Sequence, residues 1–124
     1  MQKEELMIKL KILIIEDNSF WQESYWHQLE DKITILQAFT EEEAREIFRQ
    51  NPDIALIVMD GCLQAQKNCL DTLDLTEEIR KSFAGPMIAA SGDQHFRCLL
   101  QDAGCNHQAS KKLLPYKIKE LLKL

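Results

Sequence analysis

Short apolar runs recur along this chain, separated by segments with the periodicity of helices. The run over 54–59 is rich in β-branched residues, ends on Asp60 and is followed at once by Gly61. Its length and composition predict a strand buried on both faces, in the middle of a parallel sheet. In open α/β sheets, ligands bind outside the carboxyl ends of the strands, so Asp60 is placed at a candidate site. The alternative is that Asp60 only caps the loop that follows it.

Four other segments have the same strand character. The alternation of side chains over 32–38 favours a strand near the sheet edge, whereas the pattern over 106–110 predicts only a weak strand. The predicted strands are 10–15, 32–38, 54–60, 87–90 and about 106–110.

Five segments between and after these runs place apolar residues at helical spacing. Thr40 and Glu43 form a capping box, Asp93 is a suitable N-cap, and Gly104 supplies the backbone turn that ends a helix. Pro115 stands where the first turn of a helix tolerates proline. The stretch over 61–70 shows neither a clear period nor strong turn residues. The predicted helices are about 19–30, 40–50, 72–83, 93–103 and 114–122.

This alternation predicts an α/β fold, in which a doubly wound, five-stranded parallel sheet carries helices on both faces. Each crossover between parallel strands is then a right-handed βαβ unit. A chain of 124 residues is long enough for one hydrophobic core and too short for two. We therefore expect a polar lead over 1–9 and a single domain over 10–124, with no output domain in this chain.

Composition and charge narrow the classes of partner. With 45% apolar and 28% charged residues, the composition is typical of a globular protein. A formal net charge of −5 argues against binding to DNA or to an anionic membrane, so a protein partner is favoured. No apolar run approaches the roughly 18 residues that span a bilayer, and the N-terminus lacks a signal-peptide pattern. We expect a cytoplasmic protein.

The cysteines show no metal or redox motif. The chain has four of them, Cys62, Cys69, Cys98 and Cys105. No pair has the two-residue spacing of a zinc knuckle or a redox dithiol, so four unpaired thiols are expected in a reducing compartment. A metal site that combines His95 and His107 with nearby cysteines is a less favoured alternative.

Polar side chains follow four of the five predicted strands, and a doubly wound sheet brings these strand ends to one rim. They are Glu16 and Asp17 after the first strand, Asp60 after the third, Ser91 after the fourth and Lys111 after the fifth. Crowded carboxylates repel one another unless a cation lies among them, and Mg²⁺ prefers such oxygen ligands together with water and phosphate oxygens. A hydroxyl and an ammonium suit the other oxygens of a phosphoryl group.

This combination of residues favours phosphoryl transfer, in which catalysis is mostly positioning and electrostatic stabilisation. Asp60, alone on the central strand, is the candidate nucleophile that would become an aspartyl-phosphate. Glu16 and Asp17 are better suited to hold the metal. Taken singly, each residue has a simpler explanation as a solvated turn, a helix cap or a surface charge.

Four segments carry a family resemblance: Ile-Leu-Ile-Ile-Glu-Asp-Asn at 12–18, Leu-Ile-Val-Met-Asp-Gly at 56–61, Ile-Ala-Ala-Ser-Gly at 88–92 and Ala-Ser-Lys-Lys-Leu at 109–113. As a set, they resemble the receiver domain of two-component response regulators, over about 10–124. The resemblance implies a flavodoxin-like fold and a cytoplasmic signalling module. Such a domain is not an enzyme beyond its own phosphorylation and dephosphorylation.

The resemblance also implies roles for individual residues. Asp60 would accept a phosphoryl group from a phosphohistidine on a sensor kinase or a histidine phosphotransfer protein. Mg²⁺ would be bound by Glu16, Asp17, Asp60 and the backbone carbonyl of Cys62. Ser91 would move onto the phosphoryl group and reshape the surface of the fourth and fifth helices, where a downstream protein would bind. Cys62 and Asp93 occupy positions whose residues, in the family, set the rate at which water attacks the phosphoaspartate.

Two departures from the family pattern leave alternatives open. The family usually has an aromatic residue three positions before the lysine, and this chain has Gln108 there, with His107 beside it as a candidate substitute. The family usually has a proline directly after the lysine, and this chain has Lys112. A receiver-like interaction module that signals without phosphorylation is therefore the alternative. An aspartate-nucleophile phosphatase is disfavoured, because Cys62 stands where its general acid would be needed.

Overall fold

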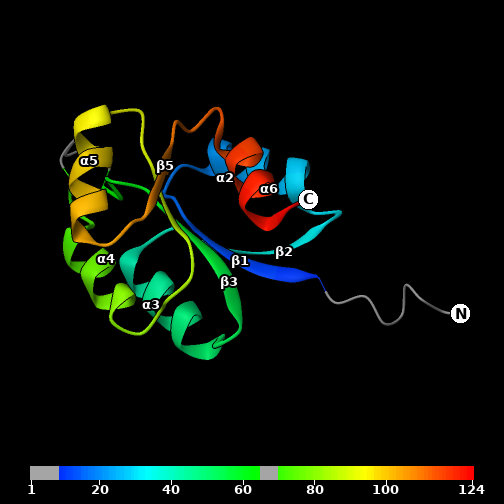
Figure 1. The fold of residues 1–124 in the computed structure, drawn as a ribbon, viewed down its shortest axis with the longest axis horizontal. Coiled ribbons are helices and arrows are strands. Elements are labelled where there is room, and N and C mark those ends of the chain that lie inside the picture. The colour runs from blue at the N-terminus through cyan, green and yellow to red at the C-terminus, as the bar shows by residue number, and fades with distance from the viewer. Residues whose placement is uncertain (1–8, 65–69) are drawn as a thin grey trace, which may run out of the picture.

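The computed structural model describes residues 9–64 and 70–124. Within them, one sheet of parallel strands has the order β2-β1-β3-β4-β5 (Figure 1). The strands are β1 (Leu10–Ile15), β2 (Ile33–Ala38), β3 (Ile54–Met59), β4 (Met87–Ala90) and β5 (His107–Ala109). The helices are α2 (Ser19–Leu29), α3 (Glu41–Gln50), α4 (Leu73–Arg80), α5 (Gln94–Ala103) and α6 (Leu114–Leu122). The predicted α/β class and strand alternation are confirmed.

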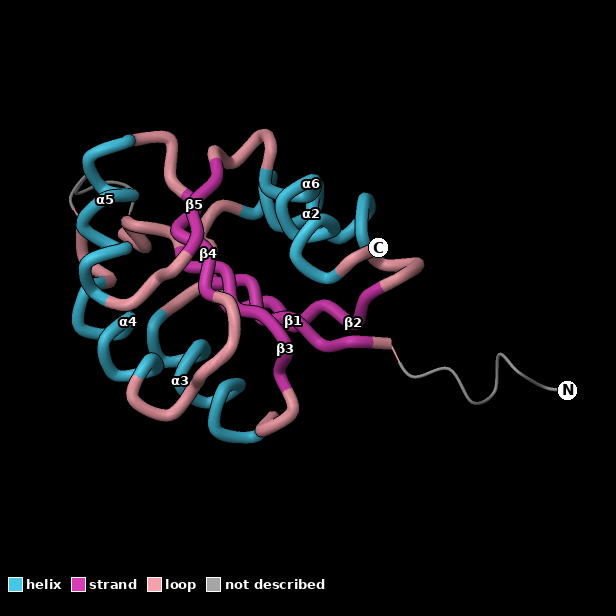
Figure 2. Tube along the Cα trace, viewed as in Figure 1, coloured by secondary structure: helices cyan, strands magenta, loops and turns pink. Residues whose placement is uncertain are grey.

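The helices form two layers around the sheet. Helices α2 and α6 lie on one face, and α3, α4 and α5 lie on the other (Figure 2). Successive side chains of β3 therefore enter different cores: Ile57 packs with Ile79 of α4, whereas Val58 packs with Ile118 of α6. This two-sided burial explains the unbroken apolar run of β3 and its central position. The alternating strand, β2, is at the sheet edge as predicted.

The starts of α3 and α5 follow the predicted caps, whereas Thr72, before α4, makes no side-chain cap. Thr40 Oγ1 accepts a hydrogen bond from the Glu43 backbone N–H at 3.1 Å. The Glu43 carboxylate reaches the N–H of Phe39 at 2.7 Å and not that of Thr40, so the box closes one residue earlier than the standard pattern. Asp93 caps α5 by accepting from the N–H groups of His95 and Phe96.

Two parts of the sequence prediction concern the segment between β3 and β4. Helix α4 ends at Arg80 and not at Phe83, whose ring instead packs edge-on against Phe48 with centroids 6.3 Å apart. Of the stretch over 61–70 that showed no clear period, residues 65–69 lie outside the described residues.

In the described part of the chain, no helix is long and apolar enough to cross a membrane.

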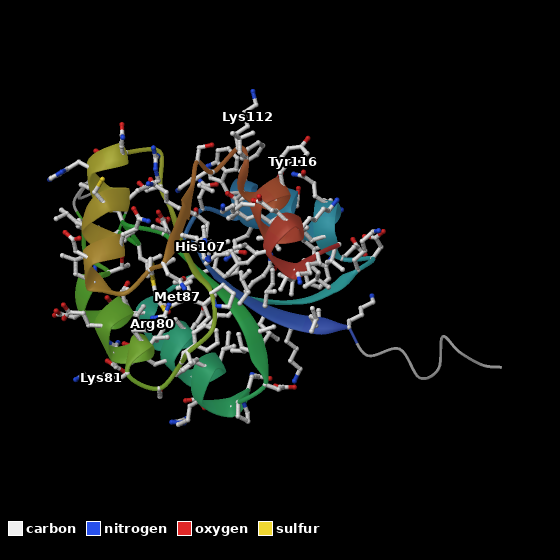
Figure 3. All side chains as sticks on the ribbon, in the orientation of Figure 1. Arg80, Lys81, Met87, His107, Lys112 and Tyr116 are labelled. Atoms are coloured by element: carbon white, nitrogen blue, oxygen red, sulfur yellow. The ribbon has the colours of Figure 1, made fainter. Side chains whose placement is uncertain are left out.

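Arg80 ties the end of α4 to the entry of β4 and the end of α5. Its guanidinium donates to the carbonyls of Phe83 at 2.6 Å, Gly85 at 2.9 Å and Gly104 at 2.9 Å (Figure 3). We expect Arg80→Met to lower the free energy of unfolding by about 2–3 kcal/mol, because several partly buried carbonyls lose a charged donor. Urea denaturation measures this change. Lys81→Met is the control, because Lys81 is the neighbouring residue and is exposed. A Lys81→Met variant as unstable as Arg80→Met would contradict the prediction.

Candidate functional site

The acids that follow β1 and β3 are fixed at one rim of the sheet by their own backbone. The N–H of Glu16 donates to the Ala38 carbonyl of β2, and the N–H of Asp60 donates to the Ile15 carbonyl of β1, both at 3.0 Å. Each hydrogen bond extends the parallel ladder by one residue beyond the strand. The two carboxyl groups are therefore carried to the same place by rigid neighbouring strands.

Lys111 joins these acids from the other side of the site. Its Nζ lies 2.9 Å from Glu16 Oε1 and 3.4 Å from Asp60 Oδ1. One carboxylate oxygen from each of Glu16, Asp17 and Asp60 lies within 4.8 Å of the others. The second oxygen of Glu16 accepts the backbone N–H of Asn18 at 3.0 Å. The structure thus brings together the acids and the lysine that the sequence predicted.

Burial makes the negative charge at this site costly. Glu16 and Asp60 are only 2% and 3% exposed. Loss of hydration and repulsion from Asp60 raise the pKa of Glu16 to about 8, although Lys111 and the Asn18 N–H oppose the rise. Burial likewise raises the pKa of Asp60 against the opposing effect of Lys111. Burial lowers the pKa of Lys111, but its hydrogen bond to Glu16 and the charges of both acids outweigh this and leave it raised.

A cavity of about 260 Å³ opens beside Asp60. It is lined by Asp17, Asn18, Asp60, Cys62, Ser91, Gly92, Asp93, Phe96 and Lys111. Asp60 Oδ1 lies 3.5 Å from the Cys62 backbone nitrogen, whereas the buried Oδ2 has no hydrogen-bond partner among the described residues. A buried carboxylate oxygen without a partner is costly, so Oδ2 is suited to receive a ligand.

The donor set fits a hard divalent cation. Asp17 and Asp60 line the cavity, and the free Oδ2 supplies an oxygen of the kind that Mg²⁺ binds. Glu16 is already engaged by Lys111 and by the Asn18 N–H, which leaves it behind the cavity wall. The carbonyl of Cys62 remains a predicted ligand. Of the described residues, this cluster alone has the spacing of a metal site, so the cysteine–histidine alternative gains no support.

Two side chains beneath the site were not predicted from the sequence as functional. Gln22, only 1% exposed, donates through Nε2 to the carbonyls of Ile14, Glu16 and Ala38 at 3.0–3.1 Å. Tyr25 donates its hydroxyl to the carbonyl of Lys111 at 3.0 Å. The sequence signal that could have indicated this role is that Gln22, a polar residue, stands three residues before Tyr25 on the buried face of α2.

The two candidate replacements for the family's aromatic residue lie in different surroundings. Gln108 accepts a hydrogen bond from Arg97 of α5 at 2.9 Å. His107 is paired in register with Ile88, which packs in the core under α2 and α6, whereas Gln108 is paired with Ala89 of the opposite core. Only Gln108 therefore lies on the α5 side.

Comparisons with solved structures identify the same fold, while a scan against protein-family models and a search of curated proteins find no match. A two-component response regulator from Clostridium difficile is 24% identical, with a TM-score of 0.78 over 93% of this chain and 97% of that one. A response regulator from Burkholderia pseudomallei, with a phosphorylated aspartic acid, calcium ion and citrate, is 17% identical, with a TM-score of 0.77 over 92% and 66%.

A third similar structure contains a phosphotransfer partner. It is the receiver domain of a response regulator from Saccharomyces cerevisiae in complex with a histidine phosphotransfer signalling protein. The identity is 26%, with a TM-score of 0.73 over 91% of this chain and 88% of that one. The resemblance inferred from the sequence is thus confirmed at the level of architecture. The chain has the fold of response regulator receiver domains.

Proposed function

We propose that this chain is a phosphoacceptor receiver domain of two-component or phosphorelay signalling. The observation that carries the proposal is the buried Asp60 carboxylate, whose Oδ1 faces Lys111 while Oδ2 has no partner among the described residues. A nucleophile with one polarised oxygen and one free oxygen, beside a cavity, is suited to accept a phosphoryl group. The donor would be a phosphohistidine on a sensor kinase or a histidine phosphotransfer protein.

In the proposed reaction, an oxygen of Asp60 attacks the phosphorus atom of the phosphohistidine. The P–N bond breaks, and its electron pair returns to the imidazole nitrogen of the donor. Lys111 stabilises the negative charge on the phosphoryl oxygens, and Ser91 at the cavity wall donates its hydroxyl to one of them. Mg²⁺, held by Asp17, Asp60 and the Cys62 carbonyl with Glu16 behind them, would neutralise the remaining charge.

Two of the similar structures support the chemical class. The Burkholderia pseudomallei protein carries a phosphorylated aspartic acid with a calcium ion, and the Saccharomyces cerevisiae domain is bound to a phosphotransfer protein. We propose that this chain signals through protein contacts of α5, β5 and α6, in the cytoplasm and without binding DNA. Its chemistry would be limited to its own phosphorylation and dephosphorylation. Gln108, at the family's aromatic position, favours the phosphorylation-independent module as the second candidate.

The proposal is tested by incubation with Mg²⁺ and a small phosphodonor such as acetyl phosphate, followed by intact mass spectrometry. We expect the mass of one phosphoryl group to be added to the wild-type chain and to be absent from Asp60→Asn. Asp53→Asn is the matched control, because Asp53 is an exposed acid at the opposite end of the same strand. Failure of the wild type to form an adduct, or an equal adduct on Asp60→Asn, would contradict the proposal.

A further inference from the structure

Arg97 of α5 spans two strand ends without an acidic partner. Its Nη1 donates to the carbonyl of Ser91 at 2.5 Å, and its Nε donates to Gln108 Oε1 at 2.9 Å. In the described part of the chain, no ion pair involves Arg97, whereas Arg45 and Arg49 on α3 both pair with glutamates. Both partners of Arg97 are neutral, so these contacts position groups and do not balance charge.

Arg97 holds the backbone of Ser91, a residue of the cavity wall, although Arg97 itself does not line the cavity. The Ser91 carbonyl accepts from Arg97, while Ser91 Oγ accepts the backbone N–H of Asp93 at 3.1 Å. Asp93 is itself fixed as the N-cap of α5, the helix that carries Arg97. The loop after β4 is therefore closed on itself by four hydrogen bonds, and Ser91 lies at the wall of the cavity beside Asp60.

Gln108 fixes the orientation of the guanidinium. It lies on β5, paired in register with Ala89 of β4, and its side-chain oxygen receives the Nε–H of Arg97. The planar guanidinium can satisfy both acceptors at once, which a lysine ammonium cannot do with the same geometry. β5 is thereby linked through Arg97 to the backbone of Ser91.

We propose that Arg97 is a positioning residue that holds Ser91 for contact with a phosphoryl group on Asp60, and that Gln108 orients Arg97. This inference rests on the proposed function and assigns a role to the residue that replaces the family's aromatic. Because the Ser91 backbone is already fixed at the cavity wall, only its side chain has to be ordered when the ligand binds, which lowers the cost of binding. Loss of Arg97 therefore weakens the binding of a phosphoryl mimic, while the Asp60 carboxylate and the metal ligands stay unchanged.

The test is the affinity for beryllofluoride with Mg²⁺, measured by the fluorescence of Trp21, which stacks on Tyr25 with ring centroids 5.9 Å apart. We expect about tenfold weaker binding for Arg97→Met, because a charged hydrogen bond to the Ser91 backbone is lost. The affinity of Arg97→Lys should be reduced nearly as much as that of Arg97→Met, and the affinity of Gln108→Leu should be reduced by less. The double variant should bind no more weakly than Arg97→Met, because both residues act through one contact. Arg49→Met, at the opposite rim, removes the same charge and should bind normally.

A second readout needs no phosphoryl mimic. Amide hydrogen exchange of Asp93, whose N–H is bonded to Ser91 Oγ, should be faster in Arg97→Met and unchanged in Arg49→Met. Arg97 variants that lose stability but keep the wild-type affinity, or that bind more tightly, would overturn the proposal. A wild type that binds no beryllofluoride contradicts the proposed function instead, and unchanged Asp93 exchange would separately show that Arg97 does not hold this loop.

Discussion

Replacing Lys111 with methionine is expected to slow the phosphorylation of Asp60 by about 100-fold and to destabilise the fold at pH 9. The Lys111 ammonium lies within 3.4 Å of both buried carboxylates, so it stabilises them in the resting state and stabilises the phosphoryl oxygens during transfer. Removal of one donor to the transition-state charge typically costs at least about 100-fold in rate. Removal of one partner of a buried ion pair costs about 3–5 kcal/mol, because the remaining charge is left without compensation.

The loss of stability should depend on pH. Without Lys111, the raised pKa values of Glu16 and Asp60 rise further, because the opposing cation is gone. Up to about pH 8, wild-type Glu16 keeps its own proton in the folded state, so the two proteins lose stability in parallel. From about pH 8 upward the wild type releases this proton while the variant, with its higher pKa, keeps it, so the deficit relative to wild type grows from pH 8 to pH 9.

Lys112→Met is the matched control. It removes the same charge one residue later, from a side chain that is exposed and points away from the site (Figure 3). Urea denaturation at pH 6 and pH 9, together with the rate of phosphorylation by acetyl phosphate, separates the two lysines. If Lys111→Met and Lys112→Met behaved alike in both assays, Lys111 would be a surface charge and not part of the site.

The fold and the main site residues could be predicted because their signals are local. The strands β1 and β4 were predicted to the residue from their apolar runs, and β3 was predicted one residue too long. The acids after β1 and β3 needed only the rule that parallel strands end at one rim. The end of α4 was predicted less well. Phe83 continues the four-residue apolar spacing of the helix, but Arg80 takes up the carbonyls of Phe83 and Gly85 and the chain leaves the helix there.

The supporting contacts could not be predicted because they join residues far apart in the sequence. Tyr25 and Lys111 are separated by 86 positions, and neither residue type indicates that the Tyr25 hydroxyl will donate a hydrogen bond to the Lys111 carbonyl. The acid four residues before Arg97 is Asp93, but it caps α5 and does not pair with Arg97. The two acceptors of Arg97 became visible only when β4 and β5 were paired. Sequence patterns therefore located the reacting groups, while their orientation came from the tertiary structure.

Without added metal, the wild-type protein is expected to lose a few kcal/mol of stability as the pH rises from about 5 to about 8. The pKa of Glu16 is about 8 in the fold against an ordinary value of 4.5, and that of Asp60 is also raised. In this window the unfolded chain has released protons that the folded chain keeps, so stability falls with rising pH, by about 1.4 kcal/mol for each unit of pKa difference. Thermal unfolding across this range measures the effect.

Mg²⁺ should reverse this loss, because the cation competes with the protons for the same carboxylates. We expect Mg²⁺ to raise the unfolding temperature more at pH 8 than at pH 6. Asp60→Asn removes one of the mutually repelling acids, so the variant should stay folded, lose less stability toward pH 8 and gain less from Mg²⁺. An unfolded Asp60→Asn protein would make Asp60 a structural acid. An Mg²⁺ effect as large in the variant as in the wild type would place the cation away from Asp60, because a ligand stabilises the fold only through the groups that bind it.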